Sequence, residues 1–194
     1  MPWQVLWALL CIMPLSGAEI AHADPSLSVV FPATLATYTF AKIDHFDDAR
    51  LGYALSYAGA NGEVADIYVY DLGLAGIGSG PNDPQVKTAV TGALADIREV
   101  QSLGYYEAVT LEADRGLRMR ELTKGHWHCT SLALTVNATL TAGGALTTAR
   151  THLLVTSLRG KLIKIRCTHA QSDPGGDAST GAFANAVALV LALP

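Results

Sequence analysis

Two short segments carry most of the residue types that could bind a metal or act as nucleophiles. The segment His126-Trp127-His128-Cys129 is followed much later in the chain by Cys167-Thr168-His169. Two cysteines and three histidines could form a tetrahedral zinc site. In an exported chain, the same two cysteines could instead form a disulfide. Which of these is feasible depends on how the strands that carry the two segments pair.

Two short connectors predict this pairing. If Arg159-Gly160 is a two-residue hairpin loop, Cys167 lies opposite His152. If Gly143-Gly144 is a second such loop, Cys129 lies six residues away along the middle strand, which is about 20 Å at about 3.3 Å per residue. A disulfide requires Cα atoms within about 7 Å of one another. The pairing therefore argues against both the disulfide and the five-ligand zinc site and leaves them as minority alternatives.

The same pairing predicts one further group on a single face of the sheet. It contains two neighbouring rows, with Asn137, Arg150 and His169 in one and Thr135, His152 and Cys167 in the other. A cysteine beside a histidine can act as a nucleophile with its base, so one hypothesis is an enzyme that uses the His152/Cys167/His169 strand face. The alternative is a structural role, because thiols in the middle of a strand lack the surroundings that activate a cysteine. Cys167 would then pack with Ile163 and Ile165 as a small hydrophobic residue.

The remaining motifs indicate no complete functional site. The acidic cluster Asp44-His45-Phe46-Asp47-Asp48 lacks the central glycine and distal glutamate of a calcium loop and is interpreted as a solvated turn. The glycine-rich segment Gly73–Pro81 lacks the nucleotide-binding patterns and is interpreted as a flexible crossover with space for a pocket beside it. Asn137-Ala138-Thr139 matches an N-glycosylation acceptor, which matters only in a eukaryotic secretory pathway. Serine-hydrolase and zinc-peptidase motifs do not occur, so the sequence predicts no catalytic residue, no metal ligand and no cofactor.

The elements that must position these residues follow from apolar spacing and turn residues. Segment Leu35–Phe46 is rich in β-forming residues and is expected to open the fold. Segments Arg50–Ala58 and Val64–Leu72 flank the turn Gly59-Ala60-Asn61-Gly62 and predict a hairpin.

A helix is predicted from Asp83, its N-cap, and Pro84, its first residue, to the C-cap glycine Gly104. Its apolar face comprises Val86, Val90, Ala93, Ile97 and Val100. Five strand-like segments follow, at Tyr105–Ala113, Gly116–Leu122, His126–Leu140, Ala145–Leu158 and Lys161–His169. After a polar loop at Gln171–Asp177, a final helix runs from Ser179 or Thr180 to Leu193. It is too short to cross a membrane, so we expect it to be buried, with a dimer contact as the alternative.

Together these elements predict an α+β domain, an antiparallel sheet of about six or seven strands covered by two helices, in the order β-β-α-β-β-β-β-β-α. This order resembles the PsbP-like fold, which includes the bacterial DcrB-like periplasmic proteins. The resemblance rests on the hairpin RLGYALSYAGANGEVADIYVYDL, the helix DPQVKTAVTGALADIREVQSLG and the hairpin LLVTSLRGKLIKIRCTHA before FANAVALVLAL. It implies a small binding or assembly-accessory protein and carries no catalytic motif to any position here.

The N-terminal segment predicts export. An apolar run from Val5 to Leu15 precedes Ala21-His22-Ala23, which resembles a signal-peptidase site. We therefore expect a signal peptide at residues 1–23 and a single domain of 171 residues at 24–194 that is periplasmic or secreted. Cys11 follows Leu10, which does not fit a lipoprotein signal, and an uncleaved N-terminal anchor is the alternative.

Charge divides unevenly between the two halves of the chain. Residues 24–114 contain 4 basic and 13 acidic side chains, whereas residues 115–194 contain 9 basic and 3 acidic ones. We expect the halves to neutralise each other across one sheet, and the alternative is a basic face for an anionic partner. Basic motifs with interleaved aromatic residues do not occur, so no nucleic-acid partner is expected.

These features favour an exported, non-enzymatic accessory domain that binds a protein partner or a small ligand. The sequence predicts no transmembrane segment in the mature chain and leaves the oligomeric state open. A candidate binding surface comprises Tyr68, Tyr70, Tyr105, Tyr106, Arg118 and Arg120. The two alternatives are an enzyme that uses the His152/Cys167/His169 face and a carrier of apolar ligands with a cavity between the sheet and the helices.

Overall fold

The fold is built around one large antiparallel sheet. The computed structural model describes residues 19–104, 106–111, 118–123, 127–139 and 146–192. Of these, only the backbone is described at residue 107 and between residues 111 and 147. The helices are α1 (Pro84–Ser102) and α2 (Gly176–Ala192), and a 3₁₀ turn covers Ala49–Leu51. The strands are β1 (Ile20–Asp24), β2 (Val29–Pro32), β3 (Thr34–Leu35), β4 (Tyr38–His45), β5 (Tyr53–Ala58), β6 (Val64–Tyr70), β7 (Tyr106–Leu111), β8 (Arg118–Thr123), β9 (Trp127–Thr139), β10 (Leu146–Leu158) and β11 (Lys161–Ala170).

Within this part of the chain, nine strands form one sheet in the order β3-β4-β5-β6-β11-β10-β9-β7, with β8 also paired to β9. A second, two-stranded sheet contains β1 and β2. The predicted α+β class is confirmed, and the predicted element order is roughly reproduced. The large sheet has more strands than expected because β3 and β4 extend it beyond the predicted hairpin.

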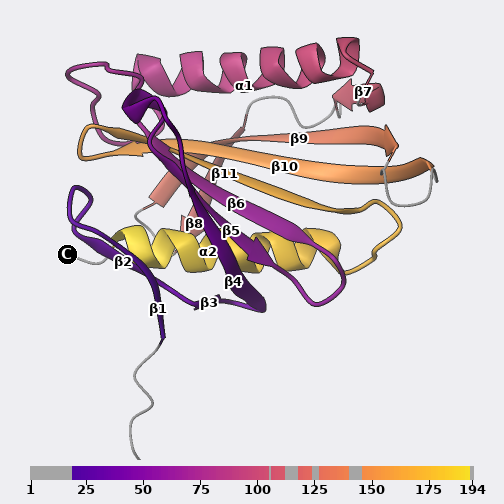
Figure 1. Cartoon of the computed structure of the whole chain (residues 1–194), viewed down its shortest axis with the longest axis horizontal. Coiled ribbons are helices and arrows are strands. Elements are labelled where there is room, and N and C mark those ends of the chain that lie inside the picture. The colour runs from indigo at the N-terminus through magenta and orange to yellow at the C-terminus, as the bar shows by residue number, and fades with distance from the viewer. Residues whose placement is uncertain (1–18, 105, 112–117, 124–126, 140–145, 193–194) are drawn as a thin grey trace, which may run out of the picture.

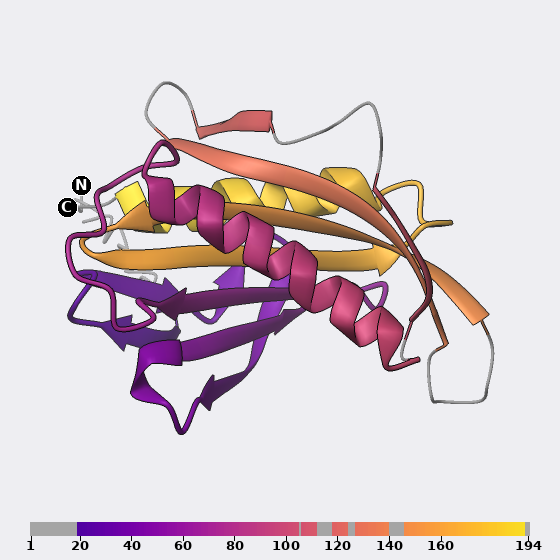
Figure 2. The ribbon, with the colours of Figure 1, turned by 90° about the horizontal axis from the view of Figure 1, so that it is seen from above.

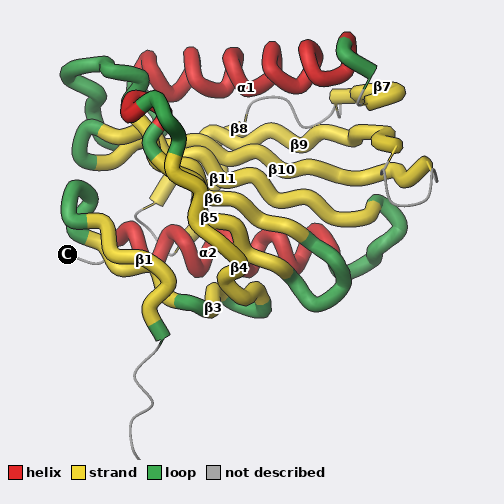
Figure 3. Tube along the Cα trace, in the orientation of Figure 1, coloured by secondary structure: helices red, strands yellow, loops and turns green. Residues whose placement is uncertain are grey.

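The two helices cover opposite faces of the large sheet (Figures 1, 2 and 3). This arrangement follows from the alternation of side chains along each strand. On β11, Ile163 and Ile165 belong to the core that contains the buried side chains of α2, together with β1–β2 residues such as Phe31. Leu162 belongs to the other core, which contains the buried side chains of α1. Each strand in the centre of the sheet therefore presents one set of residues to each helix.

Helix α1 begins and ends where the sequence predicts. The Oδ1 atom of Asp83 accepts a hydrogen bond from the backbone N–H of Gln85 at 2.8 Å, and Pro84 is the first helical residue. The chain leaves the helix through Gly104, whose φ of 82° lies in the left-handed region that glycine adopts without strain. Of the predicted apolar face, Val86, Val90, Ala93 and Ile97 are buried.

The strand pairing confirms one of the two predicted registers. Leu158 lies opposite Lys161 and His152 lies opposite Cys167, as expected for a two-residue loop at Arg159-Gly160. The predicted β5–β6 hairpin is also present, and Ala65, Ile67 and Val69 alternate with less buried residues along β6.

The register between β9 and β10 differs from the prediction by two residues. Asn137 lies opposite Thr148, and Thr135 lies opposite Arg150. The pair nearest the connection is Thr139 and Leu146, so this connection contains residues 140–145, which lie outside the described residues, rather than Gly143-Gly144 alone. Because the shift is even, every side chain keeps its predicted face.

The N-terminal part of the described chain forms structure around the predicted cleavage site. The position after Ala23 lies inside β1, which pairs with β2. Asp24 is buried, and its carboxylate accepts hydrogen bonds from the backbone of Ser26 and Leu27 and from the Tyr53 hydroxyl. Residues 1–18 of the predicted signal peptide lie outside the described residues. Neither α1 nor α2 combines the length and the apolar character that a membrane span requires.

Helix α2 begins three or four residues before the predicted start at Ser179 or Thr180. Its first residue is Gly176, and this places Asp177 in its first turn rather than in the preceding loop. The helix is buried as expected, with Phe183, Ala184 and Val187 fully enclosed against the sheet.

Candidate functional site

A groove of about 620 Å³ lies between α1 and the strands β6 and β11. Its wall on the helix side consists of residues from the first four turns of α1, and its floor consists of β6 and β11 side chains that alternate toward this face. The lining residues are Phe46, Leu51, Tyr68, Tyr70, Leu72, Leu74, Gln85, Thr88, Ala89, Gly92, Ala93, Asp96, Leu162 and Lys164.

One end of the groove gathers exposed hydrophobic side chains. Phe46, Leu51, Leu72 and Leu74 are between 38% and 44% exposed, and all four line the groove. They make up four of the nine large hydrophobic residues that are exposed in the described part of the chain. Leu74 belongs to the glycine-rich segment that the sequence places beside a possible pocket. Scattered surface hydrophobics need no explanation, but their gathering in one hollow indicates a binding site.

The floor of the groove carries a cation on an aromatic surface. The Lys164 ammonium lies 4.3 Å from the centre of the Tyr68 ring and 5.9 Å from that of Tyr70. Burial lowers the pKa of Lys164, and the nearby charge of Arg166 lowers it further, while Asp96 and Asp66 act in the opposite direction. Among the described residues, no carboxylate forms an ion pair with Lys164 within 4.0 Å.

A smaller cavity of about 130 Å³ continues from this cation along α1. It shares Tyr68, Ala93, Asp96 and Lys164 with the groove and adds Ile97, Val100, Tyr106, Leu153 and Arg166. The Arg166 guanidinium donates a hydrogen bond to the Tyr106 hydroxyl at 3.0 Å. The two hollows share four residues and adjoin along α1, so the path along the helix runs from exposed hydrophobic side chains to two cations.

Helix α1 leaves open space at one position of this path. An added Cβ at Gly92 would meet no other atom within 4 Å. Gly92 therefore gives the groove width on the helix side, and a larger side chain there would enter it.

The predicted binding surface contributes in part to this groove. Tyr68 and Tyr70 line the groove and Tyr106 lines its extension. Tyr105 lies outside the described residues, and only the backbone of Arg118 and Arg120 is described, in β8. Sequence reasoning missed Lys164 and Asp96. Leu162, Lys164 and Arg166 alternate along one strand, and this spacing indicates that they share one face of the sheet. The sequence does not indicate that α1 lies above that face.

The predicted His/Cys strand face lies on the opposite side of the sheet. His152 and His169 are both buried there, on β10 and β11, and their rings stack with centroids 5.6 Å apart and planes inclined by 17°. Cys167 is a fully buried thiol in the core beneath α2. Arg150 shares this face with His169, as predicted, but Thr135 joins their row in place of Asn137, and Ala133 takes the place of Thr135 beside His152.

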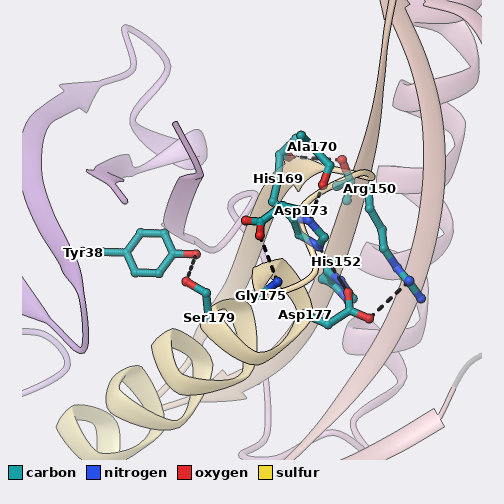
Figure 4. A network of polar contacts seen from close by, with 11 residues as sticks. Tyr38, Arg150, His152, His169, Ala170, Asp173, Gly175, Asp177 and Ser179 are labelled. Atoms are coloured by element: carbon teal, nitrogen blue, oxygen red, sulfur yellow. Dashed lines mark hydrogen bonds and ion pairs between the residues drawn. The ribbon is translucent and has the colours of Figure 1, made fainter. Parts of the chain in front are cut away.

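Asp177 completes this cluster from the first turn of α2 (Figure 4). Its Oδ1 atom lies 2.8 Å from Nε2 of His152 and 3.1 Å from Nε2 of His169, and its Oδ2 atom lies 3.2 Å from Nη1 of Arg150. Burial alone would raise the pKa of Asp177, but the histidines and Arg150 lower it. Burial lowers the pKa of His152. Sequence reasoning missed Asp177, because this residue was expected in a loop rather than in the first turn of a helix.

The β9 register also bears on the disulfide and the zinc site, both of which the predicted strand pairing argues against. Cys129 lies four residues along β9 from Ala133, which is level with His152 and Cys167. Four residues span about 13 Å, and two further strand spacings of about 4.8 Å separate the cysteines. The Cα atoms are therefore well beyond the reach of a disulfide.

The acidic cluster forms local pairs at the surface, but only Phe46, Asp47 and Asp48 leave the sheet as the predicted turn requires, because Asp44 and His45 belong to β4. Asp48 accepts hydrogen bonds from the backbone and the guanidinium of Arg50, and Asp44 pairs with Lys42 at 2.7 Å. Both pairs are solvent-exposed, and such pairs contribute little to stability.

Comparison with known proteins identifies no family for this arrangement: no family model matches the chain, and no curated protein matches its sequence.

Proposed function

We propose that this chain is a non-enzymatic binding domain that holds a small amphipathic molecule, apolar in its body and anionic at one end, in the α1 groove. The observation that carries this proposal is the gathering of four exposed hydrophobic side chains in a groove whose floor contains Lys164. Ligand sites are typically concave and apolar with a few polar groups that fix orientation. The α1 groove has this composition.

The charges along the groove favour an anion. Lys164 and Arg166 contribute two positive charges to its far end, whereas Asp96 contributes one negative charge. Lys164 is half-buried and its amine lies over the Tyr68 ring in the groove, so an anionic group could reach it there. Such a pair would offset the burial that lowers the pKa of Lys164 and would keep the amine charged.

The shape favours an elongated ligand. The lining residues on α1 extend from Gln85 to Val100. At about 1.5 Å per helical residue, this distance is about 22 Å along the helix. The exposed hydrophobic residues lie at one end of this path and Arg166 at the other, so a ligand with a single apolar body and one charged end fits it best.

The proposed setting is outside the cytoplasm, as the N-terminal segment predicts. The PsbP-like resemblance supports the same class of function, since it implies small binding proteins. The enzyme hypothesis gains no support from the groove, because His152, Cys167 and His169 lie on the other face of the sheet. The leading hypothesis from the sequence includes the binding of a small ligand, and the carrier hypothesis places an apolar ligand between the sheet and the helices. The α1 groove fits both, because it lies between the sheet and a helix.

The proposal can be tested by displacement of the fluorescent anion 8-anilinonaphthalene-1-sulfonate from the purified chain. We expect dodecanoate to displace this probe at a concentration at least about tenfold lower than dodecyltrimethylammonium, which corresponds to about 1.4 kcal/mol. Lys164→Met should remove most of this preference while it leaves the apolar contacts in place. Equal displacement by the two amphiphiles would contradict the proposed anionic end.

A steric variant tests the location. Gly92→Leu should fill the groove and weaken dodecanoate binding at least about tenfold, since a leucine buried against ligand surface removes the space for several methylene groups. The matched control is Ala95→Leu, which adds a comparable side chain at an exposed position of α1 that does not line the groove. Unchanged dodecanoate binding by folded Gly92→Leu would refute the groove as the site.

A further inference from the structure

The cluster of His152, His169 and Asp177 brings two imidazole nitrogens to one carboxylate oxygen. Among the described residues, it is the group of three ligating side chains whose donor atoms all lie within 4.8 Å of one another. Two of these donors are imidazole Nε2 atoms from neighbouring strands, and both point at the same carboxylate oxygen.

The backbone fixes the state of one of these imidazoles. Nδ1 of His169 lies 2.8 Å from the carbonyl oxygen of Ala170. A carbonyl oxygen can only accept, so Nδ1 must carry the hydrogen and donate it. In neutral His169, the Nε2 atom then presents a lone pair, and this lone pair faces Oδ1 of Asp177 at 3.1 Å. Two acceptors at this distance repel one another unless a cation or an additional proton lies between them.

We propose that His152, His169 and Asp177 bind a divalent first-row transition metal ion, of which Zn²⁺ is the representative probe. Two imidazole nitrogens and one carboxylate oxygen are a common donor set for such ions. The His169 contact to a backbone carbonyl is the support that metal-bound histidines usually have through their other ring nitrogen. This site lies on the opposite face of the sheet from the α1 groove, so the inference does not depend on the proposed ligand.

The surroundings leave room for a fourth metal ligand and limit the way in which the Asp177 carboxylate can bind the ion. The two histidines are buried, but the Asp177 side chain is 43% exposed, so water can reach the metal from that side. Arg150 binds Oδ2 of Asp177 and leaves Oδ1 for the metal, so the carboxylate is expected to bind through one oxygen. At metal–ligand distances of about 2.1 Å, tetrahedral donors lie about 3.4 Å apart. Around an ion, the two Oδ1–Nε2 distances of 2.8 and 3.1 Å would lengthen by a few tenths of an ångström, and the two Nε2 atoms, which lie within 4.8 Å of one another, would move closer together.

The site also depends on the close approach of α2 to β11. An added Cβ at Gly176 would overlap the His169 ring. The absence of a side chain at Gly176 lets the first turn of α2, and with it Asp177, lie directly against the two histidines.

The test is titration of the chelator-treated full chain with Zn²⁺ by calorimetry. We expect one Zn²⁺ per chain with a dissociation constant of about 1 µM or below, and His169→Gln and Asp177→Asn should each weaken binding at least about tenfold. His45→Gln and His128→Gln are the controls: the first removes an exposed imidazole, and the second removes a ligand of the zinc site weighed from the sequence. Zinc binding that His128→Gln abolishes and His169→Gln leaves unchanged would overturn the proposal.

A second measurement remains valid if a variant fails to fold. In the unmodified chain, ¹⁵N spectra of the imidazoles should show Zn²⁺ at Nε2 of both His152 and His169, with the proton of His169 retained on Nδ1. If His169 shows no shift with Zn²⁺ and instead carries protons on both nitrogens, the cluster binds a proton only and the proposal is wrong.

Discussion

Two glycines within helices should respond in opposite directions to the same substitution. Alanine normally stabilises a helix relative to glycine by about 0.8–1 kcal/mol. At Gly92 of α1, an added Cβ meets no atom within 4 Å, so Gly92→Ala should gain about this amount. At Gly176 of α2, the same Cβ would overlap the His169 ring. Either the ring or the first turn of α2 must therefore move.

The magnitude follows from the contacts that this movement disturbs. His169 would lose its hydrogen bond to Ala170, which contributes about 0.5–1.5 kcal/mol, and a displaced first turn of α2 would break the contact of charged Asp177 with His152, which contributes about 1.5–3 kcal/mol. After subtraction of a helical gain of about 1 kcal/mol, Gly176→Ala should lower the free energy of unfolding by about 1–3.5 kcal/mol.

Urea denaturation of the metal-free chain measures both effects, provided that the m values of the variants agree. A double-mutant cycle isolates the cause: in a His169→Ala background, Gly176→Ala should lose most of its cost because the overlapping ring is gone. If Gly176→Ala is as stable as the unmodified chain, or equally destabilising without the His169 ring, the close approach of α2 to β11 is wrong.

Three further predictions follow from other parts of the structure. Phe183 is fully buried between Tyr38 and Tyr57, so Phe183→Ala should lower the free energy of unfolding by about 3–5 kcal/mol in urea titrations, whereas an equal effect from the exposed Leu189→Ala would contradict this core. Burial alone would raise the pKa of Asp24, but its hydrogen bonds to Ser26, Tyr53 and Leu27 lower the pKa below the usual 3.8. Stability from Asp24 should thus be present above about pH 4 and decline as pH falls toward the lowered value; Asp24→Asn should flatten this decline, and an unchanged acid profile would count against these bonds. Burial lowers the pKa of Lys164 in the folded chain below 10.5, so the unfolded chain binds the Lys164 proton more tightly than the folded chain does. The free energy of unfolding should therefore rise with pH between that lowered pKa and 10.5. Between pH 7 and pH 10.5, the unmodified chain should therefore gain more stability than Lys164→Met, and equal pH profiles would show that Lys164 is not buried as described.

The sequence predicted the elements better than the contacts between them. The cap at Asp83 and the loop at Arg159-Gly160 are local signals, and both were correct because a few neighbouring residues decide them. The register of β9 against β10 was misjudged because Gly143-Gly144 resembles a two-residue turn, whereas the pair nearest the connection is Thr139 and Leu146. The resulting register error of two residues preserved the predicted faces.

The functional groups were harder to predict because they meet through tertiary packing. His152 and His169 were found from strand pairing alone, but Asp177 reaches them only because α2 folds back across the sheet. The α1 groove likewise depends on how far α1 stands above Tyr68 and Lys164. Apolar spacing indicates which side of a helix is buried and does not indicate where it leaves a hollow.

The alternation along β11 makes one strand the common support of both proposed sites. Lys164 and Arg166 point toward α1, and Cys167 and His169 belong to the face beneath α2. A one-residue insertion or deletion within this strand would turn the next residues to the wrong face, with cations entering the apolar core and imidazoles entering the groove. In descendants of this sequence, the two sites should therefore persist together or be lost together, and the length of β11 should vary less than that of any loop around it.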